Sequence, residues 1–173
     1  MHADTFLSQR RQVKPLQFPV PKPAVHATLA VHGMILAFNK PYGILSQFTK
    51  EAPHHRTLAE FGFPPGVYPV GRLDADSEGL LLMTNNGDII NRMMRAANKH
   101  EKEYKVTVDK PVTDEFLKEM AGGVPILDTV TRPCQVEKLG KYKFKIILTQ
   151  GLNRQIRRMC EALGYEVKEL RRV

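Results

Sequence analysis

Three carboxylates stand close together in the segment GRLDADSEGLLLMTNNG, which covers residues 71–87 of the 173-residue chain. Asp74, Asp76 and Glu78 occupy a glycine-flanked loop directly before an apolar run, residues 80–83. Such carboxylates could bind calcium, order a turn through its backbone amides, or work as a glycosidase pair. One of them could also stabilise the positive sugar carbon that forms when a base–sugar bond breaks. The neighbouring residues decide among these four chemistries.

Two of the four fit the sequence poorly. An EF-hand calcium loop needs glutamate at its twelfth position, where this chain has Asn85, and its ninth position is Leu82. A glycosidase normally presents aromatic platforms to a neutral sugar, whereas this chain has no tryptophan and a net charge of +8. The ordered turn and the nucleic-acid chemistry stay open.

The charge of the whole chain favours a polyanionic partner. Lys and Arg number 26 against 18 Asp and Glu, an excess that is typical of nucleic-acid binding. No apolar run approaches the roughly 18 residues of a membrane span, and no apolar stretch follows Arg10 and Arg11 as in a secretory signal. Cys134 and Cys160 lack metal-ligand spacing, so we expect core thiols in a cytoplasmic protein.

Asp74 is the candidate for chemistry on a nucleic acid, because it follows Arg72 and precedes a strand that would hold it rigidly. A carboxylate that faces phosphates needs a nearby cation to stay ionised. The sequence therefore has to supply an arginine from another element.

The segment NRQIRRMCEALG, residues 153–164, predicts a helix that supplies it. The i, i+3, i+4, i+7 spacing defines a core face of Ile156, Met159, Cys160 and Leu163. At about 100° per residue, Arg154 and Arg158 point away from this face, whereas Arg157 lies on its flank and can reach a cleft. Asn153 is expected to cap the helix and Gly164 to end it. Alternatively, all three arginines are solvated.

The other segments predict an α+β domain with a mixed, largely antiparallel β-sheet and flanking helices. EKEYKVTVD alternates as a half-buried strand, with Tyr104, Val106 and Val108 on one face. Further strands are expected at MILAF, GVYPVG, LLLMT, CQVEKL, YKFKIILTQ and YEVKEL. Helices are expected at RTLAEF, with Thr57 near its start, at TDEFLKEMAGG, capped by Thr113, and at DIINRMMRAA, with Ile89, Ile90, Met93, Met94 and Ala97 at helical spacing.

The globular part is expected at residues 33–173, after an extended Pro-rich basic arm at residues 1–32. The stretch VKPLQFPVPKPAVH carries four prolines and no period. The arm either touches RNA phosphates or is an inert tail, and its basic residues are Arg10, Arg11, Lys14 and Lys22.

Several motifs resemble the RsuA-type family of bacterial ribosomal RNA pseudouridine synthases. FNKPYGI is similar to the first motif of that family, GRLDADSEGLLLMTNNGD to its catalytic motif and GLNRQIRRMCEALGYEVKEL to its last. RAANKHEKEYKVTVDKP and GVPILDTVT resemble the type F synthases of large-subunit RNA, whereas LSQFT, TLAEFG and GVYP resemble type E. The likeness runs from about residue 35 to residue 170.

This resemblance implies a central active-site cleft in which a specific uridine of 23S ribosomal RNA is isomerised to pseudouridine without cofactor or metal. Asp74 would be the catalytic carboxylate and Arg157 its ion-pair partner. Tyr104 would stack on the target base, and Arg72 would hold the displaced nucleotide or fill its place. A likeness to type F also implies a transfer RNA as a possible second substrate.

The remaining site residues follow from the same motifs. Ile156 would pack under the pocket, and Asp76 and Glu78 would order the loop. Lys40 and Pro41 of the first motif would have a mainly structural role. The candidate RNA contacts beside Arg72 are Lys40, Asn153, Arg154 and Arg158.

Two departures from the family pattern favour an alternative, a non-catalytic RNA-binding or ribosome-assembly module. No S4-type RNA-binding domain is expected before residue 33, as in type E relatives. The chain stops at KELRRV, where relatives continue, so we expect a C-terminally incomplete catalytic domain. A monomer is the expected state.

Overall fold

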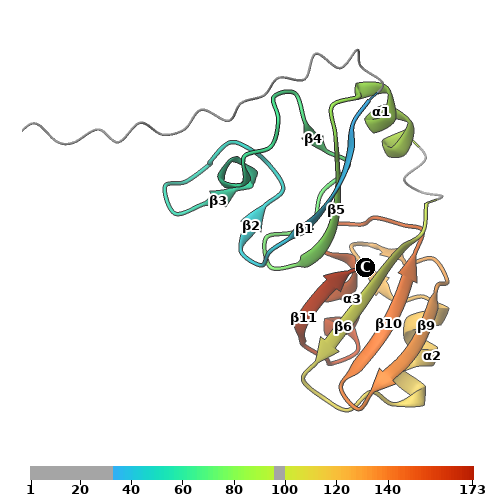
Figure 1. The fold of residues 1–173 in the computed structure, drawn as a ribbon. Coiled ribbons are helices and arrows are strands. Elements are labelled where there is room, and N and C mark those ends of the chain that lie inside the picture. Colours follow the sequence, from blue (N-terminus) through green and yellow to red (C-terminus); the bar gives the residue numbers. More distant parts are fainter. Residues whose placement is uncertain (1–32, 96–99) are drawn as a thin grey trace, which may run out of the picture. The chain divides into compact units, whose positions relative to one another are not determined.

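The computed structural model describes residues 33–95 and 100–173, so the predicted arm and Ala97 lie outside the described residues. Seven strands form one sheet (Figure 1): β1 (Ile35–Lys40), β4 (Tyr68–Pro69), β5 (Glu78–Thr84), β6 (Lys102–Val108), β9 (Gln135–Gly140), β10 (Lys143–Leu148) and β11 (Val167–Arg172). The order is β1-β5-β11-β6-β10-β9, with β4 also paired to β5. Strands β5 and β11 are parallel, and the other pairs of this sheet are antiparallel. The predicted α+β fold with a mixed, largely antiparallel sheet is confirmed.

All four predicted helices form: η1 (Leu58–Phe61), α1 (Gly87–Arg95), α2 (Asp114–Gly122) and α3 (Gln155–Ala162). Two of them, η1 and α2, begin at their predicted threonine caps. The hydroxyl of Thr57 accepts a hydrogen bond from the amide of Ala59, 3.3 Å away, and that of Thr113 accepts one from Phe116 at 3.1 Å. Both bonds satisfy amides that a first helical turn leaves without a partner.

Two short strand pairs were not predicted. Strands β2 (Ile44–Leu45) and β3 (Arg56–Thr57) are parallel, and β7 (Pro125–Ile126) and β8 (Thr129–Val130) are antiparallel. Leu127 and Asp128 connect β7 to β8 with φ angles of 48° and 59°, the left-handed conformation of a tight hairpin turn. A two-residue strand has no side-chain alternation, so the sequence carries no periodic signal for it.

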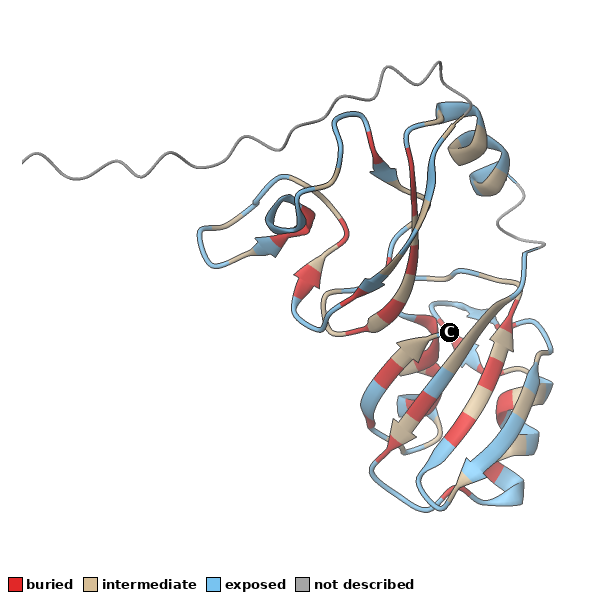
Figure 2. Cartoon of the chain, viewed as in Figure 1, coloured by how far each residue is buried: buried red, intermediate tan, exposed pale blue. Residues whose placement is uncertain are grey.

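Two hydrophobic cores lie against the sheet. The larger core packs strands β6, β10 and β11 against helices α2 and α3, and includes Val106, Phe116, Phe144, Ile156 and Met159. Along β10 the buried residues alternate, as Figure 2 shows. The smaller core consists of Ile44, Leu58, Val67, Leu73, Leu81 and Met83. Tyr104 packs against both cores.

Helix α1 forms as predicted but buries none of its described side chains (Figure 2). Ile89, Ile90 and Met93 are half-buried, and Met94 is 52% exposed. The apolar spacing therefore predicted the helix correctly, although these side chains add little to either core.

Both cysteines are unpaired thiols, as predicted. Cys160 is buried in the larger core, and burial raises its pKa to about 12. Cys134 is half-buried, and burial raises its pKa too. Both thiols therefore stay protonated near neutral pH. Within residues 33–95 and 100–173, no helix is long and apolar enough to cross a membrane.

Candidate active site

The main chain of the acidic loop, residues 71–78, is held in place by Ser46 and by Gly43 of the first motif. The hydroxyl of Ser46 donates to the carbonyl of Leu73 at 2.6 Å and accepts from the amide of Leu73 at 2.9 Å. The amide of Gly43 donates to the carbonyl of Ala75 at 2.6 Å. Gly43 has φ 83°, which favours glycine at this turn. The turn NKPYG therefore supports the loop that carries the carboxylates.

A turn within the loop presents Asp74 to solvent. The amide of Ser77 donates to the carbonyl of Asp74 at 3.0 Å, and Ser77 is buried. Leu73, just before Asp74, belongs to the smaller core. Buried neighbours on both sides fix the loop backbone, whereas 43% of the Asp74 side chain stays exposed.

The start of helix α3 differs from the prediction. Arg154, not Asn153, is the N-cap residue, and it has the left-handed φ of 49° and no side-chain cap. Asn153 instead accepts two hydrogen bonds from the guanidinium of Arg158, each 2.9 Å long. These bonds hold Arg158 along the surface of its own helix.

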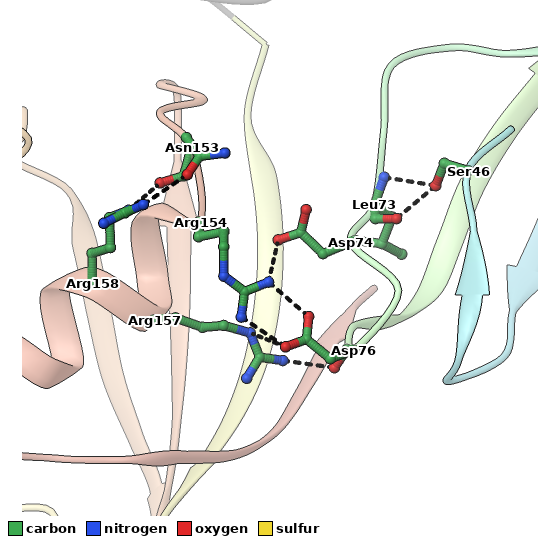
Figure 3. Close-up of polar contacts among 8 residues, drawn as sticks. All are labelled: Ser46, Leu73, Asp74, Asp76, Asn153, Arg154, Arg157 and Arg158. Carbon is green, nitrogen blue, oxygen red and sulfur yellow. Dashed lines mark hydrogen bonds and ion pairs between the residues drawn. The ribbon is translucent and has the colours of Figure 1, made fainter. Parts of the chain in front are cut away.

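Arg154 binds both carboxylates of the acidic loop (Figure 3). Its two terminal nitrogens donate to the two oxygens of Asp76 at 3.0 and 2.7 Å, and one of them lies 3.5 Å from Oδ2 of Asp74. The prediction grouped Arg154 with Arg158 as an outward phosphate contact, whereas Arg154 lines the cleft and binds the acidic loop. The helical wheel applies only within Gln155–Ala162, and the left-handed backbone at Arg154 directs its side chain to the loop.

Arg157 reaches the same loop, but at a different carboxylate. Its NH2 group donates to the main-chain carbonyl of Asp76 at 2.6 Å, and its buried Nε, which makes no hydrogen bond, lies 3.4 Å from Oδ2 of Asp76. The predicted flank position is confirmed, whereas the predicted pair is wrong: within the described part of the chain, Arg157 makes no ion pair with Asp74. The position of Arg157 on the helix predicts the direction of its side chain, but not which of two carboxylates two residues apart, Asp74 or Asp76, it will pair with.

The charges in this cluster determine the state of Asp76. Hydrogen bonds from Arg154, together with the positive charges of Arg157 and Arg154, hold the pKa of Asp76 below its ordinary value. Asp76 is therefore ionised near neutral pH. It acts as the anchor of both arginines, in agreement with the prediction that it orders the loop.

A cleft of about 610 Å³ opens beside this cluster, within the range of roughly 300–1,000 Å³ that is typical of ligand pockets. Its walls include six of the eight predicted site residues: Arg72, Asp74, Tyr104, Asn153, Arg154 and Arg157. Ile156 also lines it, as predicted for the pocket floor. Among the described residues in its walls, Asp74 is the one carboxylate.

Lys40 does not line this cleft, and as an RNA contact it was predicted wrongly. Its side chain is buried, and its ammonium donates to the carbonyls of Pro41 at 3.0 Å and Ile44 at 2.7 Å. Burial lowers the pKa of Lys40 to about 8, an effect that Asp74 and the other loop carboxylates partly oppose. Lys40 thus stabilises the NKPYG turn, the structural role expected for the first motif.

Arg158 also stands apart from the cleft. Its hydrogen bonds to Asn153 leave it half-buried on helix α3. The prediction that it faces outward agrees with this position, and a phosphate contact stays a prediction.

Two cations of the cleft were not predicted, Lys102 on β6 and Arg172 on β11. The Nε of Arg172 donates to the carbonyl of Leu80 at 2.7 Å, and burial and the charge of Arg172 lower the pKa of Lys102. A signal existed for Lys102, because it shares a strand face with Tyr104 two residues later. Across residues 33–95 and 100–173, no three His, Cys, Asp or Glu side chains converge as a metal site requires.

The fold is that of a pseudouridylate synthase. A crystal structure of a pseudouridylate synthase superposes with a TM-score of 0.72 at 31% identity, over 81% of this chain and 61% of that one. A structure of an H/ACA ribonucleoprotein bound to RNA shares the fold at 17% identity, with a TM-score of 0.56 over 80% of this chain and 46% of that one.

Residues 34–162 match the RNA pseudouridylate synthase family, and the chain belongs to it. It is 55% identical over 140 residues to the dual-specificity RNA pseudouridine synthase RluF of Shigella flexneri, over 80% of this chain and 48% of that protein. It is 40% identical to the ribosomal large subunit pseudouridine synthase E of Xanthomonas axonopodis pv. citri, over 81% and 84% of the two chains. The chain thus spans about half the length of its RluF relatives.

Proposed function

We propose that the chain is an RNA pseudouridine synthase that isomerises a specific uridine of large-subunit ribosomal RNA. One observation carries the proposal: among the described residues that line the cleft, Asp74 is the single carboxylate, and it lies with Tyr104 and cationic side chains. The relatives support the substrate, because the name of the Xanthomonas protein refers to the ribosomal large subunit. The cytoplasmic location and the monomeric state stay predictions.

The target uridine has to leave the RNA stack before Asp74 can reach its sugar. Turning a base out costs a few kcal/mol. Stacking on an aromatic ring returns roughly 1–3 kcal/mol, and we propose Tyr104 for this contact because its ring lies in the cleft wall between the two cores. Arg72, which donates to Gln47 at 2.7 Å at the cleft edge, would hold the displaced strand.

Asp74 then assists cleavage of the bond between the sugar C1′ and N1 of uracil. The detached uracil turns within the cleft and rejoins the sugar through its C5, while the proton on C5 leaves and N1 gains one, so that no atom is lost overall. Because the free base must stay bound during this rotation, the reaction needs walls that limit its movement. Apolar walls come from Leu148, Ile156 and Leu170.

The surrounding cations account for RNA as the substrate. Arg72, Lys102, Arg154, Arg157 and Arg172 line the cleft. Phosphate contacts from such side chains supply most of the affinity for a nucleic acid, and this affinity falls steeply with salt. We therefore propose that these residues follow the RNA backbone on both sides of the target.

The experiment is incubation of the chain with unmodified 23S ribosomal RNA, followed by mapping of pseudouridine through chemical derivatisation. New pseudouridine at one or a few positions is expected, and the map identifies the target uridine. Parallel incubation with unmodified transfer RNA tests the second substrate implied by the likeness to RluF. Salt-sensitive RNA binding without any new pseudouridine would instead support the binding or assembly module.

A further inference from the structure

We infer that Asp76 is a positioning residue: it engages the guanidinium of Arg154 and thereby leaves the carboxylate of Asp74 open to the cleft. The inference rests on the proposed catalytic role of Asp74. Asp76 itself does not line the cleft, so its carboxylate would act on the reaction through the arginines that it holds, and Arg154 is the one of these that also approaches Asp74.

The contacts of Arg154 are unequal. It forms two parallel hydrogen bonds with Asp76, of 3.0 and 2.7 Å, but only a single 3.5 Å approach to Asp74. A bidentate arginine–carboxylate pair is stronger and more directional than one long contact. Asp74 therefore has one oxygen that the arginine does not engage, and Figure 3 shows this oxygen pointing away from the guanidinium.

The backbone of Arg154 is anchored beside the loop. It has a left-handed conformation at the start of helix α3, where its carbonyl accepts the amide of Arg158 at 3.0 Å. From this position the guanidinium reaches both loop carboxylates. If the charge at position 76 is lost, Asp74 is the remaining carboxylate that pairs with Arg154, and a bidentate pair with it would block the oxygen that the reaction needs.

Asp76 can be altered without releasing the loop. Arg157 donates to the main-chain carbonyl of Asp76, Gly43 donates to that of Ala75, and the hydroxyl of Ser46 bonds the main chain of Leu73. Asp76→Asn preserves these contacts and removes the charge. Glu78→Gln is the matched control, because Glu78 lies in the same segment but pairs with Arg171 at 3.5 Å.

The first test measures single-turnover pseudouridine formation at saturating enzyme, so that differences in RNA affinity cancel. Asp76→Asn is expected to slow the reaction at least about tenfold. The reason is that the added contact with Arg154 stabilises Asp74 in its resting state, before the reaction. Glu78→Gln is expected to keep the original rate. The double variant Asp76→Asn/Arg154→Met is expected to react faster than Asp76→Asn, because the blocking cation is gone. An Asp76→Asn rate equal to that of the unaltered chain, or a double variant no faster than Asp76→Asn, overturns the inference.

The second test does not depend on activity. A crystal structure of the Asp76→Asn variant is expected to show both terminal nitrogens of Arg154 in hydrogen bonds with Asp74. Arg154 retained at the new amide of position 76, or turned to solvent, overturns the inference even if the chain proves to be an active synthase. Conversely, the expected geometry stands if the proposed function fails, so the two failures are distinguishable.

Discussion

The larger core and the smaller core are built in different ways. The larger core joins seven-residue and six-residue strands to two helices, whereas the smaller core packs Leu81 and Met83 of β5 against turns, η1 and the short strand β2. Arg154 and Arg157 come from the start and the flank of α3 on the larger core, and Asp74 follows Leu73 of the smaller core. A helix and the residue before it therefore supply the arginines, whereas a loop held by a few hydrogen bonds supplies the carboxylate.

Phe144→Ala is expected to give the largest loss of stability. The ring is fully buried in the larger core and lies 5.3 Å from that of Phe116. Its removal leaves a cavity and should lower the free energy of unfolding by about 3–5 kcal/mol, measured by denaturant titration. Tyr142→Ala is the control, because its side chain is 43% exposed. A loss below about 1 kcal/mol for Phe144→Ala would contradict the role assigned to the larger core.

Lys40, which is buried in the NKPYG turn, should make the free energy of unfolding depend on pH. Its pKa of about 8 in the folded chain lies below its ordinary value of 10.5, so the unfolded chain binds more protons between these two values. The contribution of Lys40 to the free energy of unfolding should therefore rise with pH from about 8 to 10.5, by about 3 kcal/mol, and be flat below 8.

The measurement is the difference in unfolding free energy between the original chain and Lys40→Met, followed across this pH range. Other titrating groups cancel in that difference. A difference that stays constant, or that falls as pH rises, would mean that the buried ammonium is not destabilised by burial as its position implies.

Ser46→Ala should separate the loop from the rest of the fold. It removes the one hydroxyl that bonds both the amide and the carbonyl of Leu73. The free energy of unfolding should fall by about 1–3 kcal/mol, and the segment before Asp74 should loosen. Single-turnover pseudouridine formation should slow as well. The control is Thr113→Ala, which removes the cap of α2 at a cost of about 0.5–2 kcal/mol. Equal rates in the two variants would show that the Ser46 contacts do not position Asp74.

Periodic patterns predicted the parts of the fold that depend on a buried face. The alternation around Val106 and Val108 predicted β6, and the spacing of Ile156, Met159 and Cys160 predicted α3. The two-residue strands carry no such pattern. The N-cap was predicted wrongly because Asn153 has the favoured residue type, whereas the chain uses a left-handed Arg154 that brings a charge to the loop.

The sequence predicted which residues meet at the site better than it predicted the ion pairs between them. The motifs placed Asp74, Tyr104 and Arg157 at one cleft, which the geometry bears out. They did not predict that Asp76 would bind both Arg154 and Arg157, because the choice between two carboxylates two residues apart depends on the path of the loop backbone, for which the sequence has no periodic signal. The burial of Lys40 was also hidden, because a lysine before a proline turn has no pattern that distinguishes it from a surface cation.

The most direct test of the proposed catalytic role of Asp74 compares pseudouridine formation on 23S ribosomal RNA by Asp74→Asn and by Glu78→Gln, a variant in the same segment. Asp74→Asn is expected to fold, to bind RNA with unchanged salt dependence and to form no pseudouridine. Glu78→Gln is expected to react at the original rate. Pseudouridine formation by Asp74→Asn at the original rate would contradict the assignment of Asp74 as the catalytic carboxylate of this cleft.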